Sequence, residues 1–148
     1  MKTSLLNKAF ATNAGSAALI LRVPVGLILM AHGAQKLFGW FGGNGLAGTA
    51  GWLSSMGMEP GLLMAILAGS AEFFGGLALV LGLLTRPAAI VAAFTMLVAI
   101  FSVHIGNGLF AADGGYEYAL VLMVALIALA IQGGGYLSMD KALSEKTG

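Results

Sequence analysis

Four long apolar segments dominate this chain, and they leave few folds open to it. They cover about residues 17–38, 61–84, 87–106 and 117–137. A helix needs about 20 mostly apolar residues to cross the hydrocarbon core of a bilayer. Only 9% of the residues are charged and 59% are hydrophobic, whereas soluble domains carry about 25% charged residues. We therefore predict one all-α domain, residues 1–148, that crosses a membrane as a four-helix bundle.

The links between these segments predict how the helices follow one another. Only Thr85, Arg86 and Pro87 separate the second segment from the third, so these two form an antiparallel hairpin. Pro87 suits the first turn of a helix, where its missing N–H is not needed, and Thr85 is a candidate N-cap. Within the Gly-rich link at 39–60 we expect a short amphipathic surface helix at about residues 47–57.

The basic residues outside the apolar segments predict the orientation, because Lys and Arg concentrate on the cytoplasmic side of membrane proteins. With a cytoplasmic N-terminus, five basic residues lie inside and Lys36 lies at the outer boundary. The five are Lys2, Lys8, Arg86, Lys141 and Lys146. We therefore predict that both termini are cytoplasmic (N-in/C-in), that 39–60 faces outward, and that the bilayer surrounds the bundle.

The composition argues against several functional classes. The chain has no cysteine, which excludes a dithiol redox centre, a thiolate metal site and a disulfide. The net charge of +1 comes with no basic stripe, so we expect no nucleic-acid partner. The Gly-rich stretch at 42–45 precedes no strand-to-helix unit and lacks a following Lys, so it is not a phosphate-binding loop.

Ionisable side chains inside the apolar segments are not explained by apolar packing. At the bilayer centre each costs at least about 2.5–3.5 kcal/mol, so such groups usually face the bundle interior and have a partner. At about 1.5 Å per residue, Glu72 lies about 18 Å from the cytoplasmic end, too deep for its short side chain to reach water. We predict a polar pocket in the outer half of the bundle, formed by His32, Gln35, Lys36, Glu72, His104 and Glu117.

Helical spacing groups these residues, although each also has a simpler interpretation. His32 and Lys36 are four residues apart and share a helix face, with Gln35 beside them. Lys36 could instead extend to the membrane interface, and His104 could be a hydrogen-bonded histidine of the bundle. Glu117 begins the fourth segment, where the helix dipole alone favours a carboxylate.

Arg22 lies near the cytoplasmic end of the first segment, and we predict that it is a structural charge. It could reach lipid headgroups, or it could pair with Glu72 across a depth difference of about 10 Å. His32, His104 and Glu72, with Glu117 as a further ligand, are residue types that hold zinc or iron. They come from separate helices and form no local spacing motif, so we predict no metal site.

Several motifs resemble the DoxX family of small membrane proteins. They are HGAQKLFG at 32–39, GTAGWLSSMG at 48–57, AEFFGGLALVLGLLTRPAA at 71–89, GYEYALVLMVALIAL at 115–129 and GGGYLSMD at 133–140. The resemblance implies a four-helix bundle in the bacterial inner membrane. That family is named for a subunit associated with a terminal quinol oxidase and thiosulfate:quinone oxidoreduction. The positions that match its signatures are Arg22, His32, Gln35, Lys36, Glu72, Arg86 and Glu117.

Two classes of function follow, and no reaction is assigned. We favour an accessory, assembly or scaffold component of a membrane complex, because no complete catalytic set is visible. The alternative is a redox-associated subunit that binds a quinone or similar small molecule in the outward-facing polar pocket. There His32, Gln35 or Lys36 would hydrogen-bond carbonyl oxygens, and Glu72 would exchange protons. A diffusible quinone or a partner subunit would then carry the electrons.

The orientation can be tested by labelling a single introduced cysteine, since the chain has none of its own. We expect a membrane-impermeant maleimide to label Gly45→Cys from outside intact cells, because residue 45 lies in the outward link. Labelling that requires opening of the cytoplasmic side would contradict this orientation.

Overall fold

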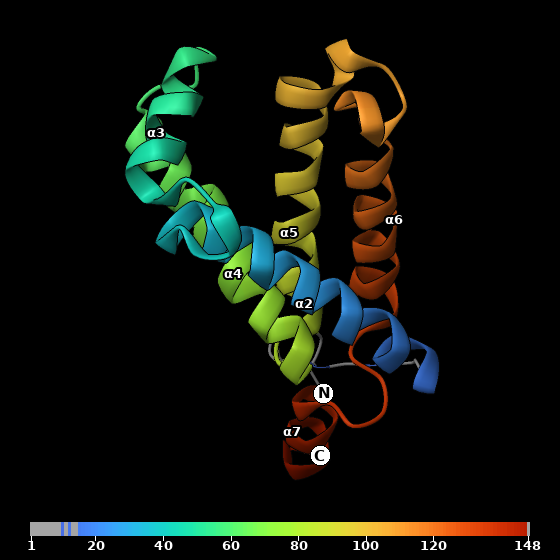
Figure 1. Cartoon of the computed structure of the whole chain (residues 1–148). Coiled ribbons are helices and arrows are strands. Elements are labelled where there is room, and N and C mark those ends of the chain that lie inside the picture. Colours follow the sequence, from blue (N-terminus) through green and yellow to red (C-terminus); the bar gives the residue numbers. More distant parts are fainter. Residues whose placement is uncertain (1–9, 11, 13–14, 148) are drawn as a thin grey trace.

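The computed structural model describes residues 10, 12 and 15–147, and 15–147 is helical without strands. Its helices, coloured along the chain in Figure 1, are α2 (Ser16–Phe38), α3 (Gly45–Ser55), α4 (Gly61–Leu81), α5 (Thr85–Ala99), α6 (Glu117–Gln132) and α7 (Met139–Thr147). The all-α prediction is confirmed. Within this part of the chain, α2, α4 and the continuous segment Thr85–Asn107 are long and apolar enough to cross a membrane. Helix α6 is apolar but has 16 residues, so the fourth crossing stays a prediction.

Glycines with positive φ set the ends of two helices earlier than we predicted. Helix α4 stops at Leu81 because Gly82 has φ 65°. The N–H groups of Gly82 and Leu83 donate hydrogen bonds to carbonyl oxygens in the last turn of the helix. Helix α6 stops at Gln132 because Gly133 has φ 84°. The surface helix predicted at 47–57 is present as α3, shifted by two residues. Helix α5 continues into a π-helical turn, Ile100–His104.

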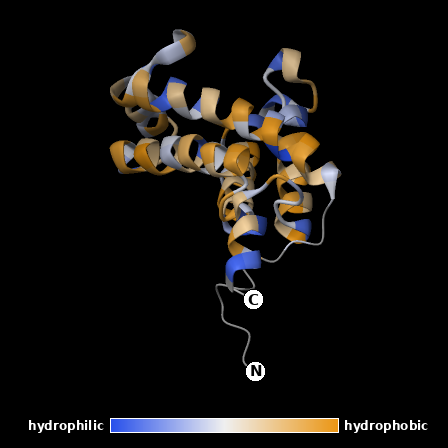
Figure 2. Cartoon of the chain, turned by 90° about the horizontal axis from the view of Figure 1, so that it is seen from below, coloured by the Kyte–Doolittle hydropathy of each residue, from blue (hydrophilic) through white to orange (hydrophobic). Residues whose placement is uncertain are grey.

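The long helices form two pairs, α2 with α4 and α5 with α6 (Figure 1). The turn 82–84, the loop 133–138 and α7 lie at one end of the bundle, which we call the hairpin end. Helix α3 and the α5–α6 connection lie at the opposite end, which we call the α3 end. Figure 2 shows hydrophobic residues along the long helices and a largely hydrophilic α7. Since Lys2 and Lys8 lie outside the described residues, the cytoplasmic position of the hairpin end stays a prediction.

Glycines allow α2 and α4 to pack with their backbones in contact. A Cβ atom on Gly26 would lie 2.6 Å from the carbonyl oxygen of Gly76, and one on Gly33 would lie 2.4 Å from the amide nitrogen of Phe73. On α4, a Cβ atom on Gly69 would lie 2.7 Å from the Leu37 side chain, so this glycine makes room for Leu37 of α2. The contact glycines are seven residues apart on each helix, which keeps them on one face along a crossing of two helices.

Arg22 joins the two helix pairs at the hairpin end. Its side chain is 1% exposed, so all its donors need partners within the protein. The guanidinium donates to backbone carbonyl oxygens of α4 and the 133–138 loop: Nε to Gly134 (3.0 Å), Nη1 to Leu79 (3.0 Å) and Val80 (2.6 Å), and Nη2 to Tyr136 (3.4 Å) and Leu137 (2.7 Å). The suggested pairing of Arg22 with Glu72 is therefore wrong, and the buried side chain does not extend toward headgroups, because its donors bind backbone carbonyls that include the unpaired ones at the end of α4.

Asp140 caps the N-terminus of α5 from a distant part of the sequence. Its Oδ1 accepts from the N–H of Leu84 (2.6 Å) and its Oδ2 from the N–H of Thr85 (2.9 Å). The prediction that Thr85 is the N-cap is therefore wrong: Thr85 is the first helical residue, and its buried hydroxyl has no hydrogen-bond partner among the described residues. A carboxylate with two acceptor oxygens satisfies two terminal N–H groups and favours the positive end of the helix dipole. Pro87 lies in the first turn, as predicted.

Arg86 completes the set of charged contacts at this end, which we call the hairpin-end clasp (Arg22, Arg86 and Asp140). Its Nη1 donates to the carbonyl oxygens of Ala130 (2.9 Å) and Ile131, at the end of α6. The clasp thus binds the ends of α4, α5 and α6 through their backbones.

We expect the Arg22 contacts to dominate the stability of the hairpin end. Arg22→Met removes five hydrogen bonds and should lower the free energy of unfolding by about 3 kcal/mol, since such bonds in membrane proteins average about 0.6 kcal/mol. Arg22→Lys should recover only part of this, because an ammonium cannot reproduce the planar fork of donors. Thermal unfolding in detergent measures both, with exposed Lys146→Met as the control. An unchanged Arg22→Met unfolding temperature would contradict the clasp.

Candidate functional site

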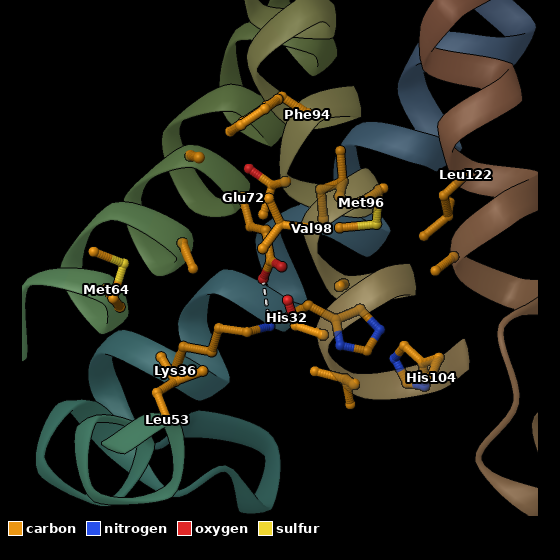
Figure 3. Close-up of a pocket in the computed structure, with 18 of the residues that line it drawn as sticks. His32, Lys36, Leu53, Met64, Glu72, Phe94, Met96, Val98, His104 and Leu122 are labelled. Carbon is orange, nitrogen blue, oxygen red and sulfur yellow. Dashed lines mark hydrogen bonds and ion pairs between the residues drawn. The ribbon is translucent and has the colours of Figure 1, made fainter. Parts of the chain in front are cut away.

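A cavity of about 720 Å³ lies between the two helix pairs and beside α3 (Figure 3). Each long helix contributes one stripe of side chains at helical spacing. The lining side chains of α2 are Leu29, His32 and Lys36. Those of α4 are at positions 64, 67, 68, 71 and 72. Ligand pockets usually have volumes of about 300–1,000 Å³ and are mostly apolar with a few polar groups. This cavity has the size and the lining of such a pocket.

Lys36 and Glu72 form an ion pair at the wall of the cavity, with Lys36 Nζ 2.6 Å from Glu72 Oε2. Their side chains are 27% and 4% exposed, respectively. The close crossing at Gly33 and Phe73 brings the last turn of α2 against the middle of α4. The sequence left the partner of Glu72 open, and the structure identifies it as Lys36. Lys36 therefore turns into the bundle rather than out to the membrane interface.

His32 and His104 extend toward the same space from α2 and from the π-helical turn after α5 (Figure 3). The His32 ring lies 6.1 Å from the Tyr118 ring between centroids. Nδ1 of His104 is 2.7 Å from the carbonyl oxygen of Gly114. Because a carbonyl only accepts, Nδ1 carries the proton and Nε2 is left as an acceptor when the ring is neutral. π-Helical turns often occur at functional sites.

Gln35 and Glu117 do not line the cavity. The Gln35 Nε2 donates to the carbonyl oxygen of Phe41 (3.3 Å), and Glu117 Oε1 accepts from the N–H of Ala111 (2.7 Å). Each side chain is thus hydrogen-bonded to the backbone of a segment that connects two helices at the α3 end. Of the six candidates, the structure brings His32, Lys36, Glu72 and His104 together around one cavity.

Sequence reasoning missed several polar and aromatic side chains of the cavity. Trp52 and Thr49 extend into it from α3, Tyr118 from α6, and Thr95 and Ser102 from α5 and its extension. The seven-residue spacing of Thr95 and Ser102 was a usable signal, because such residues share a helix face. Trp52 gave no such signal, since its position depends on how α3 folds over the bundle.

The described residues include no cluster of three His, Asp or Glu side chains that could hold a metal ion. The side chains of the cavity can form hydrogen bonds and exchange protons. Lys36 donates, Glu72 accepts, and each neutral imidazole has one donor and one acceptor nitrogen. All four groups lie among apolar residues, where polar contacts to a ligand are stronger than in water.

We expect the two partners of the ion pair to differ in their effect on stability. Lys36→Met leaves the buried Glu72 without its cation and should cost about 3 kcal/mol. Glu72→Gln should cost about 1 kcal/mol, because the partly exposed Lys36 can be hydrated in the cavity. The double variant should be more stable than Lys36→Met alone. A thermal double-mutant cycle in detergent checks this, and additive single effects would show that the pair is not coupled.

Comparison with known proteins gives the family. Residues 17–105 match the family described as DoxX. CatD of Bacillus subtilis (strain 168), whose name carries a provisional assignment as an oxidoreductase, is 30% identical over 135 residues, or 91% of this chain and 90% of CatD. The inner membrane protein YqjF of Escherichia coli (strain K12) is 34% identical over 110 residues, or 73% and 82% of the two chains.

Inner membrane protein YphA of the same strain is 30% identical over 128 residues, covering 83% of this chain and 87% of YphA. No solved structure matches the chain. The family match covers more than half of the sequence, and the relatives align over most of their lengths. This chain therefore belongs to the DoxX family and is a multi-pass protein of the bacterial inner membrane.

Proposed function

We propose that this protein binds a lipophilic small molecule with a polar ring, of the quinone class, in the cavity between the helix pairs. The observation that carries the proposal is the Lys36–Glu72 ion pair, which faces an otherwise mostly apolar cavity together with His32 and His104. In the described part of the chain, neither side chain of the pair binds backbone at a helix end, unlike the charges of the hairpin-end clasp. The pair is therefore available to a ligand.

The donors and acceptors of the cavity suit both redox forms of such a ring. An ammonium has three N–H donors, so Lys36 keeps two after its bond to Glu72 and can donate them to a ring carbonyl. The free Nε2 of neutral His104 and the Glu72 carboxylate accept, and can bind a ring hydroxyl. A bound quinone would supply two-electron, two-proton chemistry. Glu72 and the two histidines would hold the protons at the ring.

The electrons for such chemistry must come from outside this chain. The sequence has no cysteine and no evident haem, flavin or iron–sulfur motif. We therefore propose that the protein is the membrane subunit of a redox complex, and that a partner subunit or a second quinone exchanges electrons with the bound ring. The name of CatD refers to the same broad class of reaction.

An accessory or scaffold role is the second candidate. The hairpin-end clasp favours it, because Arg22, Arg86 and Asp140 all bind backbone groups, and the burial of Arg22 and Asp140 needs no ligand to explain it. In this case the cavity would hold lipid chains, and the Lys36–Glu72 pair would only join α2 to α4. Ligand binding separates the two candidates.

Binding can be measured by fluorescence, because Trp52 lines the cavity and Trp40 is the other of the two tryptophans. In a Trp40→Phe background we expect saturable quenching of Trp52 by decylubiquinone. Ala68→Phe should weaken the affinity for decylubiquinone by about tenfold or more, because the larger side chain fills part of the cavity. A tenfold loss of affinity corresponds to about 1.4 kcal/mol of binding free energy. Leu62→Phe, on the same helix but outside the cavity, is the matched control.

Quenching that does not saturate, or equal affinities of the Ala68→Phe and Leu62→Phe variants, would exclude the quinone site and favour the accessory role.

A further inference from the structure

We infer that the ligand reaches the cavity sideways from the bilayer, through the gap between α4 and α5, and that its apolar tail stays in that gap. This inference rests on the proposed function and adds two features of the ligand. It must carry a long apolar chain, of the prenyl or acyl kind, and it must be taken from the membrane rather than from water.

Helices α4 and α5 separate at a defined point along their length. A Cβ atom on Gly75 would lie 3.9 Å from the Ala88 carbonyl oxygen and 4.0 Å from the Ala92 Cβ, so the helices are in ordinary contact there. One turn closer to the α3 end, Ala71 and Thr95 already line the cavity. Figure 1 shows the two helices diverging toward the α3 end. The gap is therefore a wedge that closes toward the hairpin end.

The side chains along this wedge are apolar and uncovered. Leu67 of α4 and Val91 and Phe94 of α5 all line the cavity, yet they are 55%, 51% and 64% exposed. Such exposure means that no other described part of the chain covers them. In a membrane this side of the cavity faces lipid tails, which suit an apolar chain and disfavour a polar one.

The other parts of the lining come from α3, the α5–α6 connection, α6 and α2. At the α3 end, Trp52 and Leu53 of α3 and the residues Gly114 and Gly115 of the α5–α6 connection form part of its lining. Along α2, His32 and Lys36 face inward. The ion pair and the two histidines thus form the polar part of the lining, and the exposed side chains of the wedge form an apolar part. This separation orients an amphipathic ligand with its ring at Lys36 and Glu72 and its tail between Leu67 and Phe94.

The tail can be located with single tryptophans and a brominated ligand, since bromine quenches only nearby indoles. In a Trp40→Phe/Trp52→Phe background, Leu67→Trp places the reporter in the wedge. Ile66→Trp places it on the adjacent exposed position, outside the cavity lining. The probe is a fully substituted benzoquinone with a decyl tail, with and without bromine on the tail, at one molecule per protein in nanodiscs.

We expect bromine to increase the quenching of the Leu67→Trp reporter about twofold more than that of Ile66→Trp, because a pocket buries most of its ligand. Val91→Trp and Ile90→Trp form a second matched pair on α5, in case a tryptophan at 67 blocks the wedge. Thermal unfolding verifies that each variant is folded. Equal bromine effects within both pairs, with saturable quenching of Trp52 still seen in the separate Trp40→Phe protein, would overturn the inference and leave the proposed function standing. Loss of saturable Trp52 quenching would overturn both.

Discussion

The buried guanidinium of Arg22 is the contact on which the rest of the structure depends. A positive charge with no water around it is tolerated only when its donors are satisfied. The partners are carbonyl oxygens of α4 and of the 133–138 loop, which belong to different helix pairs. The same contacts hold Leu137 at φ 53°, and Asp140 holds Leu84 at φ 49°, conformations that non-glycine residues seldom adopt. The hairpin end is therefore closed by polar contacts to backbone.

This closure explains why the open space lies at the other end of the bundle. Helices α4 and α5 are joined by three residues and stay packed as far as Gly75 and Ala92. Beyond that level α4 follows α2, to which its glycines bind it closely, whereas α5 follows α6. The two pairs diverge, and the cavity fills the space between them. The charges divide in the same way: those at the hairpin end bind backbone, while Lys36 and Glu72 bind each other beside the cavity.

Much of the fold was predictable from the sequence, and the errors have physical causes. The apolar segments predicted α2, α4, α5 and α6, but glycines at 82 and 133 ended two of them early, because a residue with positive φ cannot continue a right-handed helix. The N-cap prediction at Thr85 considered only neighbours in sequence, whereas Asp140 reaches the same N–H groups across the fold. For the site, depth along each helix grouped His32, Lys36, Glu72 and His104, which line one cavity. It could not separate them from Gln35 and Glu117, whose side chains bind loop backbone.

The sequence by itself determined that this chain is a helical membrane protein and that its few buried charges need partners, because burial of apolar surface and the cost of an unpaired ion are local properties of residues. Only the tertiary structure determined which groups these buried charges bind. Sequence reasoning allowed Arg22 to pair with Glu72, yet Glu72 binds Lys36, 36 residues away, and Arg22 binds the chain at 134–137. The physical reason is the crossing of α2 and α4 at Gly33 and Phe73, which sets the register of the two helices. That register depends on the shapes of both helix faces in contact, which neither segment specifies alone.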